Sequence, residues 1–254
     1  MITGQQLTEL SKEFKINQTV VFREYMQLLF LQRLYLIKGS ENFLFKGGTA
    51  IHLIFNSFRF SEDLDFTCDF SEGDFKKIFN KVVSDILNMS LGFSFKEKKT
   101  ILGKSYLMKY YGEVLDFPVF VSFDFSFREK PLKKEKTILS TDFPLIFSSF
   151  VHHLSAEELL AEKIRAIFSR AKGRDFFDLW YLLDLGIKIN WNWVEKKMTY
   201  YPNIKWKREG ILKKVENYPQ KLFEKEIRPF VGMDRREKLS ELFAIIRGKI
   251  EKSI

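Results

Sequence analysis

The sequence has one cysteine and three histidines among 254 residues, and no uninterrupted apolar run of membrane-spanning length. The single Cys68 excludes an internal disulfide bond and a zinc site built from cysteines. The histidines, His52, His152 and His153, follow no spacing typical of a metal site or a catalytic triad. No stretch reaches the roughly eighteen apolar residues of a transmembrane helix, and the N-terminal segment lacks the pattern of a signal peptide. We therefore expect a cytoplasmic protein in a reducing environment, with no membrane partner.

The net charge of +9 is distributed unevenly along the chain. Residues 186–254 contain 17 Lys and Arg against 9 Asp and Glu, whereas residues 1–185 contain 25 against 24. A basic last quarter indicates a polyanionic partner such as nucleic acid, although lysine-rich helices are also a common solubilising surface. Five aromatic residues of this part of the chain could stack on bases, although packing is the more common role: Trp191, Trp193, Tyr200, Tyr201 and Trp206.

Hydrophobic periodicity divides the chain into a mixed half and a helical half. The expected elements up to residue 128 are helices over residues 5–38, 50–55 and 75–89, and strands over 43–45, 63–67, 93–98, 104–111 and 119–128. The lysine-rich, proline-bounded residues 131–144 are typical of a connection. Helices are then expected over residues 156–171, 175–185 and 191–199, followed by two or three basic helices. We predict an α+β fold, with a mixed sheet in domain 1–145 and a helical domain over 146–254.

The most informative segment joins a glycine turn to two carboxylates. Residues 47–49 read Gly-Gly-Thr, and Asp63 and Asp65 follow after thirteen further residues. Side chains alternate along a strand, so Asp63 and Asp65 share one face and repel each other unless a cation lies nearby. Backbone N–H groups at a helix start favour phosphate. Glycine pairs usually only make turns, and no Walker loop is present, but the combination indicates metal-assisted phosphoryl or nucleotidyl transfer.

Asp124 is a candidate third carboxylate. It lies between Ser122 and Ser126 on the strand face opposite a row of phenylalanines. A neighbouring strand could bring it beside Asp63 and Asp65, and three carboxylates form the hard oxygen shell that Mg²⁺ prefers. It could bind a second metal ion or accept the proton of an acceptor hydroxyl. Taken alone, Asp124 is more typical of a solvated sheet face.

The helix over residues 156–171 carries a lysine within its apolar arc. Lys163 has no acidic residue three or four positions away, and Arg170 follows on the same side. Such a lysine needs an anion, for which a triphosphate is one candidate, unless its ammonium reaches past the helix to solvent. The opposite side is expected to be solvated and consists of Glu158, Glu162, Arg165 and Ser169.

The junction after this helix is also polar. Gly173 is expected to end the helix, and Asp175 to cap the next one. Arg174 and Asp178 could pair locally or point into a cleft between the two halves. Near the glycine turn, Lys46 and Arg59 could assist phosphate binding or be surface charges.

Four segments together resemble the AbiEii/AbiGii nucleotidyltransferase toxin family, a branch of the DNA polymerase beta-type nucleotidyltransferases. They read FKGGTAIHLIF, RFSEDLDFT, VSFDFSF and ELLAEKIRAIFSRAKGRDFFDLWYLL, and they span residues 44–183. Gly-Thr stands here where such enzymes often have Gly-Ser, and the distance to Asp-x-Asp fits their pattern. The last quarter of the chain is similar only in being helical and basic.

The resemblance implies that Asp63, Asp65 and Asp124 hold Mg²⁺ and that Lys163 contacts the triphosphate of an NTP. The residues expected to bind or shape the nucleotide site are Lys46, Gly47, Gly48, Thr49, Arg59, Ser61, Lys163, Arg170, Arg174, Asp175 and Asp178. Such proteins are toxins of toxin–antitoxin or abortive-infection modules, restrained by a cognate antitoxin. Some transfer NMP to the 3′ end of tRNA and so block translation, and we expect an RNA acceptor here.

Two other functions remain open from the sequence. The acceptor could be a protein side chain or a small molecule rather than RNA. Alternatively, the fold could be catalytically idle and bind nucleic acid or a partner, although the intact set of carboxylates argues against this.

Overall fold

The computed structural model describes residues 1–254, and the chain forms two compact units. The first unit contains residues 1–56 and 60–154, and the second contains residues 57–59 and 155–254. The boundary predicted between residues 145 and 146 lies before a strand that belongs to the first unit. None of the helices combines the length and the apolarity that crossing a bilayer requires.

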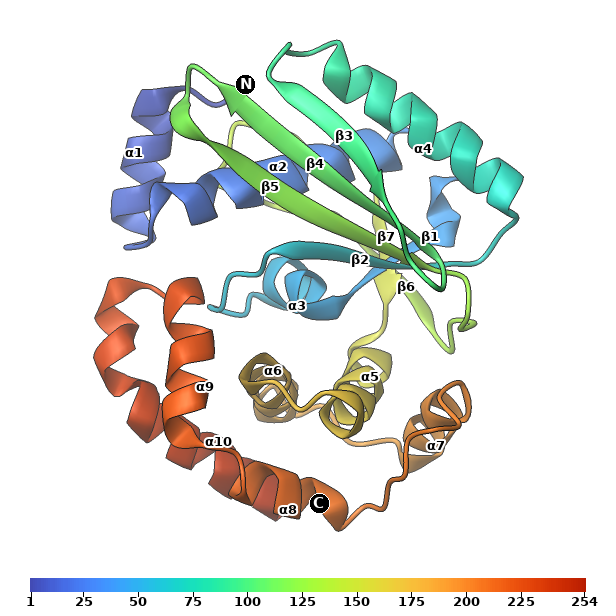
Figure 1. Ribbon diagram of the computed structural model, residues 1–254, viewed down its shortest axis with the longest axis vertical. Coiled ribbons are helices and arrows are strands. Elements are labelled where there is room, and N and C mark those ends of the chain that lie inside the picture. The colour runs from blue at the N-terminus through green and yellow to red at the C-terminus, as the bar shows by residue number, and fades with distance from the viewer. The chain divides into compact units, whose positions relative to one another are not determined.

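The first unit is built on a seven-stranded mixed sheet with the order β3-β4-β5-β2-β1-β7-β6 (Figure 1). Its strands are β1 (Phe43–Lys46), β2 (Asp63–Cys68), β3 (Phe93–Lys98), β4 (Lys104–Gly112), β5 (Leu115–Ser126), β6 (Lys134–Thr137) and β7 (Val151–Leu154). The pairs β1–β7 and β2–β5 are parallel, and the other neighbouring strands are antiparallel. The mixed sheet and the helical second half confirm the predicted α+β class.

Aromatic side chains fill the core of the first unit. Its helices are α1 (Gly4–Glu13), α2 (Gln18–Tyr35), α3 (Gly47–Phe55) and α4 (Glu72–Leu87). The ring of Phe30 on α2 lies 4.4 Å from that of Phe123, and the ring of Phe79 on α4 lies 5.4 Å from that of Phe125. Because α2 and α4 cover the phenylalanine face, the polar residues that alternate with these phenylalanines lie on the other face of the sheet.

The single helix predicted over residues 5–38 is wrong, since the structure has two helices there. The chain breaks at Lys15, whose φ of 52° is left-handed. Asn17 then caps α2, because its side-chain oxygen accepts a hydrogen bond of 2.8 Å from the backbone N–H of Thr19. The apolar periodicity continues across this break, so the pattern gave no sign of the turn.

Two short strands were not predicted. Strand β6 lies within the expected connection 131–144, and β7 follows it and pairs with both β6 and β1. Strand β6 reads Lys-Glu-Lys-Thr and has no apolar alternation. Lysine-rich edge strands are common because they discourage pairing with other chains, but they carry no strand-like pattern.

The second unit consists of helices with Ser57–Arg59, which come from the segment between α3 and β2. Its α-helices are α5 (Ala156–Ser169), α6 (Gly173–Asp184), α7 (Trp191–Thr199), α8 (Gly210–Glu216), α9 (Gln220–Ile227) and α10 (Leu239–Ser253). Helix α5 contacts α6, α7 and α8. Helices therefore pack against α5 on several sides, and charged residues of α5 form ion pairs with these neighbours.

Candidate functional site

Gly47 forms the turn between β1 and α3. Its φ of +80° is left-handed, a conformation that L side chains rarely adopt. A Cβ atom on this residue would lie 2.1 Å from Oδ2 of Asp65. The Asp65 carboxylate therefore packs directly against the backbone of the turn, and only glycine leaves room for it.

Thr49 ties the start of α3 to the start of β2. The residue is fully buried, and its hydroxyl donates a hydrogen bond to the backbone carbonyl of Asp63. The backbone carbonyl of the nearby Ser61 accepts a hydrogen bond of 3.1 Å from Nε2 of Gln27 on α2. These contacts fix the segment that carries the two aspartates.

A row of polar residues crosses four strands on one face of the sheet. Lys46 of β1 is opposite Asp65 of β2, Asp65 is beside Asp124 of β5, and Asp124 is opposite Ser105 of β4. Neighbouring strands lie about 4.8 Å apart, so Asp65 and Asp124 are close neighbours. Asp63 belongs to the same face and is beside Ser122. The alternation of β2 and β5 thus brings the three predicted carboxylates together on one face.

The carboxylates of this face differ in exposure. Asp63 and Asp65 are half-buried, whereas Asp124 is exposed. Lys46, only 8% exposed, is the cation placed across from Asp65. The buried hydroxyls of Thr67 and Ser105 on this face have no hydrogen-bond partner. Like charges on adjacent strands and buried hydroxyls without a partner are unfavourable for stability.

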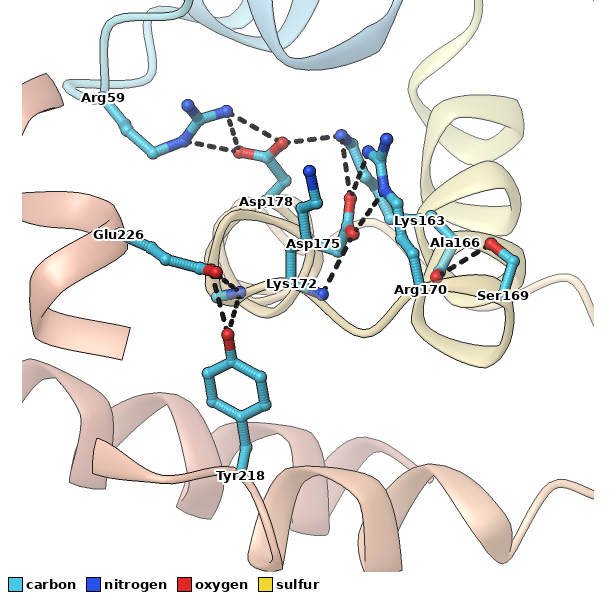
Figure 2. Close-up of polar contacts among 11 residues, drawn as sticks. Arg59, Lys163, Ala166, Ser169, Arg170, Lys172, Asp175, Asp178, Tyr218 and Glu226 are labelled. Carbon is cyan, nitrogen blue, oxygen red and sulfur yellow. Dashed lines mark hydrogen bonds and ion pairs between the residues drawn. The ribbon is translucent and has the colours of Figure 1, made fainter. Parts of the chain in front are cut away.

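In the second unit, Asp178 of α6 binds two cations (Figure 2). Arg59 donates to it through Nε at 3.0 Å and through a terminal nitrogen at 2.8 and 3.0 Å. Nζ of Lys163 lies 2.7 Å from Oδ2 of the same carboxylate. Arg59 and Asp178 are 2% and 1% exposed, so this is a buried ion pair.

Asp175 of α6 forms the second half of this network. Arg170 binds it through two nitrogen–oxygen contacts of 2.9 Å each, and Nζ of Lys163 lies 3.7 Å away. Burial by itself raises the pKa of Asp175, but the hydrogen bonds and charges of Arg170 and the charge of Lys163 lower it more. The net effect is a pKa below the usual value, and the carboxylate stays ionised.

A known protein family matches most of the chain. Residues 29–244 match the family described as nucleotidyl transferase AbiEii toxin, type IV toxin–antitoxin system. The chain belongs to this family. As an AbiEii-type protein it is a nucleotidyltransferase, with an NTP substrate and an antitoxin partner, and a divalent metal ion is general among such enzymes. No curated protein matches its sequence.

Solved structures share the fold of this AbiEii-type chain at low sequence identity. The nucleotidyltransferase toxin MenT4 from Mycobacterium tuberculosis H37Rv is similar with a TM-score of 0.66 and 16% identity, covering 98% of this chain and 90% of its own. A putative nucleotidyltransferase from H. pylori has a TM-score of 0.55 and 20% identity, covering 93% and 98%. JHP933 from Helicobacter pylori has a TM-score of 0.53 and 19% identity, covering 93% and 95%.

The sheet face that carries Asp63, Asp65 and Asp124, here called the carboxylate face, has the donor chemistry that a divalent metal ion needs in an AbiEii-type enzyme. Asp63, Asp65 and Asp124 carry carboxylate oxygens, which are hard donors, on one face of neighbouring strands. No group of three His, Cys, Asp or Glu side chains converges closely enough to hold an ion by itself. Mg²⁺ is generally held by one or two carboxylates together with substrate phosphates and water. The face therefore fits an ion that binds together with a nucleotide.

The expected position of Gly173 is wrong. Gly173 begins α6 instead of ending α5, which ends at Ser169 and is followed two residues later by Ala171 with a φ of 45°. Asp175 is the third residue of α6, and its carboxylate takes part in capping the helix by accepting from the backbone N–H of Lys172 at 3.4 Å. Lys163 does not reach past its helix to solvent, because its side chain is buried and its ammonium lies 2.7 Å from Asp178 and 3.7 Å from Asp175.

Arg174 and the start of α6 also make contacts that the sequence did not predict. Arg174 does not pair with Asp178, and its guanidinium lies 5.4 Å from the ring centre of Phe230. The backbone N–H of Gly173 donates to the hydroxyl of Tyr218 and to Glu226. The Tyr218 hydroxyl donates to Glu226 at 2.9 Å, and burial and this carboxylate raise its pKa well above the usual value. These contacts hold the start of α6.

The side of α5 predicted to be solvated is largely buried. Glu158 and Glu162 are 0% and 6% exposed, and both bind Nζ of Lys197 on α7, at 2.7 and 3.0 Å. The guanidinium of Arg165 lies 4.4 Å from the ring centre of Tyr201. Lys197 was missed because it comes from another helix, and no pattern along α5 indicates it.

Proposed function

We propose that this AbiEii-type protein transfers NMP from an NTP to an RNA acceptor, the 3′ end of tRNA, in a Mg²⁺-dependent reaction that blocks translation. The observation that supports it best is the placement of Asp65 against the Gly47 turn, with Asp63 and Asp124 on the same sheet face. Carboxylates beside a phosphate-binding turn match the needs of this chemistry. Cytoplasmic location and neutralisation by an antitoxin belong to the same proposal.

In this mechanism the glycine turn and the sheet face with the aspartates have separate roles. The turn around Gly47 and Gly48, at the start of α3, binds phosphate oxygens, because helix N-termini favour anions. Asp63 and Asp65 would hold the divalent ion, which would supply positive charge to the triphosphate. Thr49 does not contact phosphate through its hydroxyl in this scheme, since that hydroxyl holds the Asp63 carbonyl.

Asp124 is the group proposed to handle the proton. The acceptor hydroxyl oxygen forms a bond to the α-phosphorus, and the bond from that phosphorus to the pyrophosphate oxygen breaks. The hydroxyl proton passes to the Asp124 carboxylate and then to water. An exposed carboxylate on the same face as the metal ligands suits this role, because it can reach a large acceptor and exchange its proton with solvent.

Lys163 is proposed to contact the triphosphate as well. The network around it contains three cations, Arg59, Lys163 and Arg170, and two carboxylates, Asp175 and Asp178. Removal of the charge in Lys163→Met should raise the NTP concentration needed for transfer, whereas an unaltered NTP dependence would contradict this role.

The experiment that tests the function incubates the purified protein with Mg²⁺, each labelled NTP and total RNA, alongside Asp63→Ala. We expect label in a small RNA, one preferred NTP, and loss of labelling in the variant. Asp116→Ala is a matched control, because Asp116 is an exposed aspartate elsewhere on the same sheet. Label in protein or small molecules instead of RNA would contradict the RNA acceptor, and full activity of Asp63→Ala would contradict the site.

A further inference from the structure

A groove of about 600 Å³ lies in the second unit, at the end of α5 and beside α8. None of the residues discussed for catalysis lines it. Its lining consists of three aromatic residues, four lysines, one glycine and one asparagine, namely Phe168, Trp206, Tyr218, Lys205, Lys207, Lys213, Lys214, Gly210 and Asn217. The groove contains no acidic residue, and it lies in the part of the chain that carries the excess positive charge.

Aromatic rings form the apolar part of the groove. Phe168 and Trp206 are both half-exposed, and their ring centres lie 6.0 Å apart at an angle of 64°. Gly210 lies under the Phe168 ring, since a Cβ atom there would be 3.1 Å from a ring carbon. The hydroxyl of Tyr218 is already bonded to Glu226, so Tyr218 contributes mainly its ring. Trp206 and Phe168 thus offer apolar ring surface without a competing polar group.

Lysines border these rings from two segments of the chain. Lys205 and Lys207 flank Trp206 in sequence, and Lys213 and Lys214 are consecutive residues of α8 that both line the groove. The ammonium of Lys214 is 5.6 Å from the ring centre of Phe168. None of the four lysines forms an ion pair in the structure. Unpaired cations around an aromatic surface have a net attraction for anions that carry planar rings.

We propose that this groove binds a single-stranded segment of the RNA acceptor. A base would stack on the Trp206 ring with one edge against Phe168, the adjoining phosphates would contact the lysines, and the Asn217 amide would bond to a base edge. The assignment rests on the proposed RNA acceptor. An acidic peptide would satisfy the lysines but would leave the Trp206 ring unused, so the combination of rings and lysines favours nucleic acid.

The test measures binding of a short fluorescein-labelled single-stranded RNA by anisotropy, in EDTA and without NTP. Trp206→Ala should weaken binding by about 5- to 150-fold, the loss expected for one stacked base, whereas Trp206→Phe should keep most of the affinity. Lys205→Gln with Lys213→Gln, both exposed, should lower the slope of log Kd against log salt by about 1.4. The control Lys221→Gln with Lys225→Gln removes two exposed charges of α9 and should change neither quantity.

Unchanged RNA binding in both Trp206→Ala and the Lys205/Lys213 double variant would overturn the proposal. It would also be overturned if these variants lost binding to a glutamate-rich peptide and not to RNA. The transfer assay separates this failure from failure of the proposed function. RNA labelling with the same kcat/KM in wild type and variants would overturn the groove assignment alone. A wild-type protein that labels no RNA would contradict the function, while the binding measurement in EDTA would still decide the groove.

Discussion

The two units use aspartates in opposite ways. On the sheet of the first unit, Asp65 and Asp124 are on adjacent strands, and Asp124 is exposed. In the second unit, Asp175 and Asp178 are almost fully buried, and each carboxylate binds two cations. Buried carboxylates with several cations are structural elements whose partners depend on them. The aspartates of the sheet are less buried, and we propose that they serve the reaction while the buried aspartates of the second unit support the fold.

A large effect on activity should come from Asp124, the exposed aspartate of the proposed site. Asp124→Asn should lower nucleotidyl transfer by about 10²- to 10⁴-fold, the range for loss of a general base. Its free energy of unfolding should change by less than about 0.5 kcal/mol, because the side chain is exposed. Asp116→Asn on the same strand is the matched control and should retain activity. Equal activity of the two variants in the transfer assay would remove Asp124 from the mechanism.

Asp178→Ala should instead lower stability. The change leaves Arg59 buried without its carboxylate, which costs about 3–5 kcal/mol in the free energy of unfolding. Urea unfolding followed by circular dichroism measures this effect. The double variant Arg59→Met with Asp178→Leu should recover part of the loss, since it removes the buried pair and leaves Lys163 beside Asp175. A stable Asp178→Ala single variant would mean that this buried pair does not support the second unit.

Gly47→Ala tests the close approach of Asp65 to the turn. The added methyl group would displace the carboxylate, and we expect transfer to fall by about 10²-fold. The left-handed backbone should also cost about 1–2 kcal/mol of stability. Gly186→Ala is a matched control, because Gly186 has a φ of +84° and open space around its Cα. It should lose similar stability and no activity, and equal activity losses in both variants would contradict the role of Gly47.

The smallest effect is the pH dependence that Asp175 contributes. Its pKa is lower folded than unfolded, so its stabilisation is complete above the unfolded pKa and disappears as the pH falls through the folded value. Asp175→Asn should therefore be less stable than wild type by about 1–3 kcal/mol at pH 7. The difference should shrink as the pH falls below the usual value of 3.8. A difference that stays constant down to acid pH would show that the Asp175 charge is not the cause.

The sequence could predict the carboxylate face because local patterns determine it. Alternation along β2 and β5 assigns Asp63, Asp65 and Asp124 to faces, and a glycine pair before a helix indicates the turn. Nothing local indicates that Arg59 binds a carboxylate 119 positions away, or that Lys197 neutralises two glutamates of α5. Such pairs depend on helix packing. Periodicity therefore assigned Glu158 and Glu162 to solvent, although they are buried.

The central claim is that the aspartates of the first unit serve the reaction, whereas those of the second unit hold the fold. The most direct test measures the free energy of unfolding and the rate of nucleotidyl transfer for Asp65→Asn and Asp178→Asn. We predict that Asp65→Asn abolishes transfer and unfolds within about 1 kcal/mol of wild type, and that Asp178→Asn is clearly less stable. An Asp65→Asn protein that transfers normally, or that is destabilised as much as Asp178→Asn, would contradict the claim.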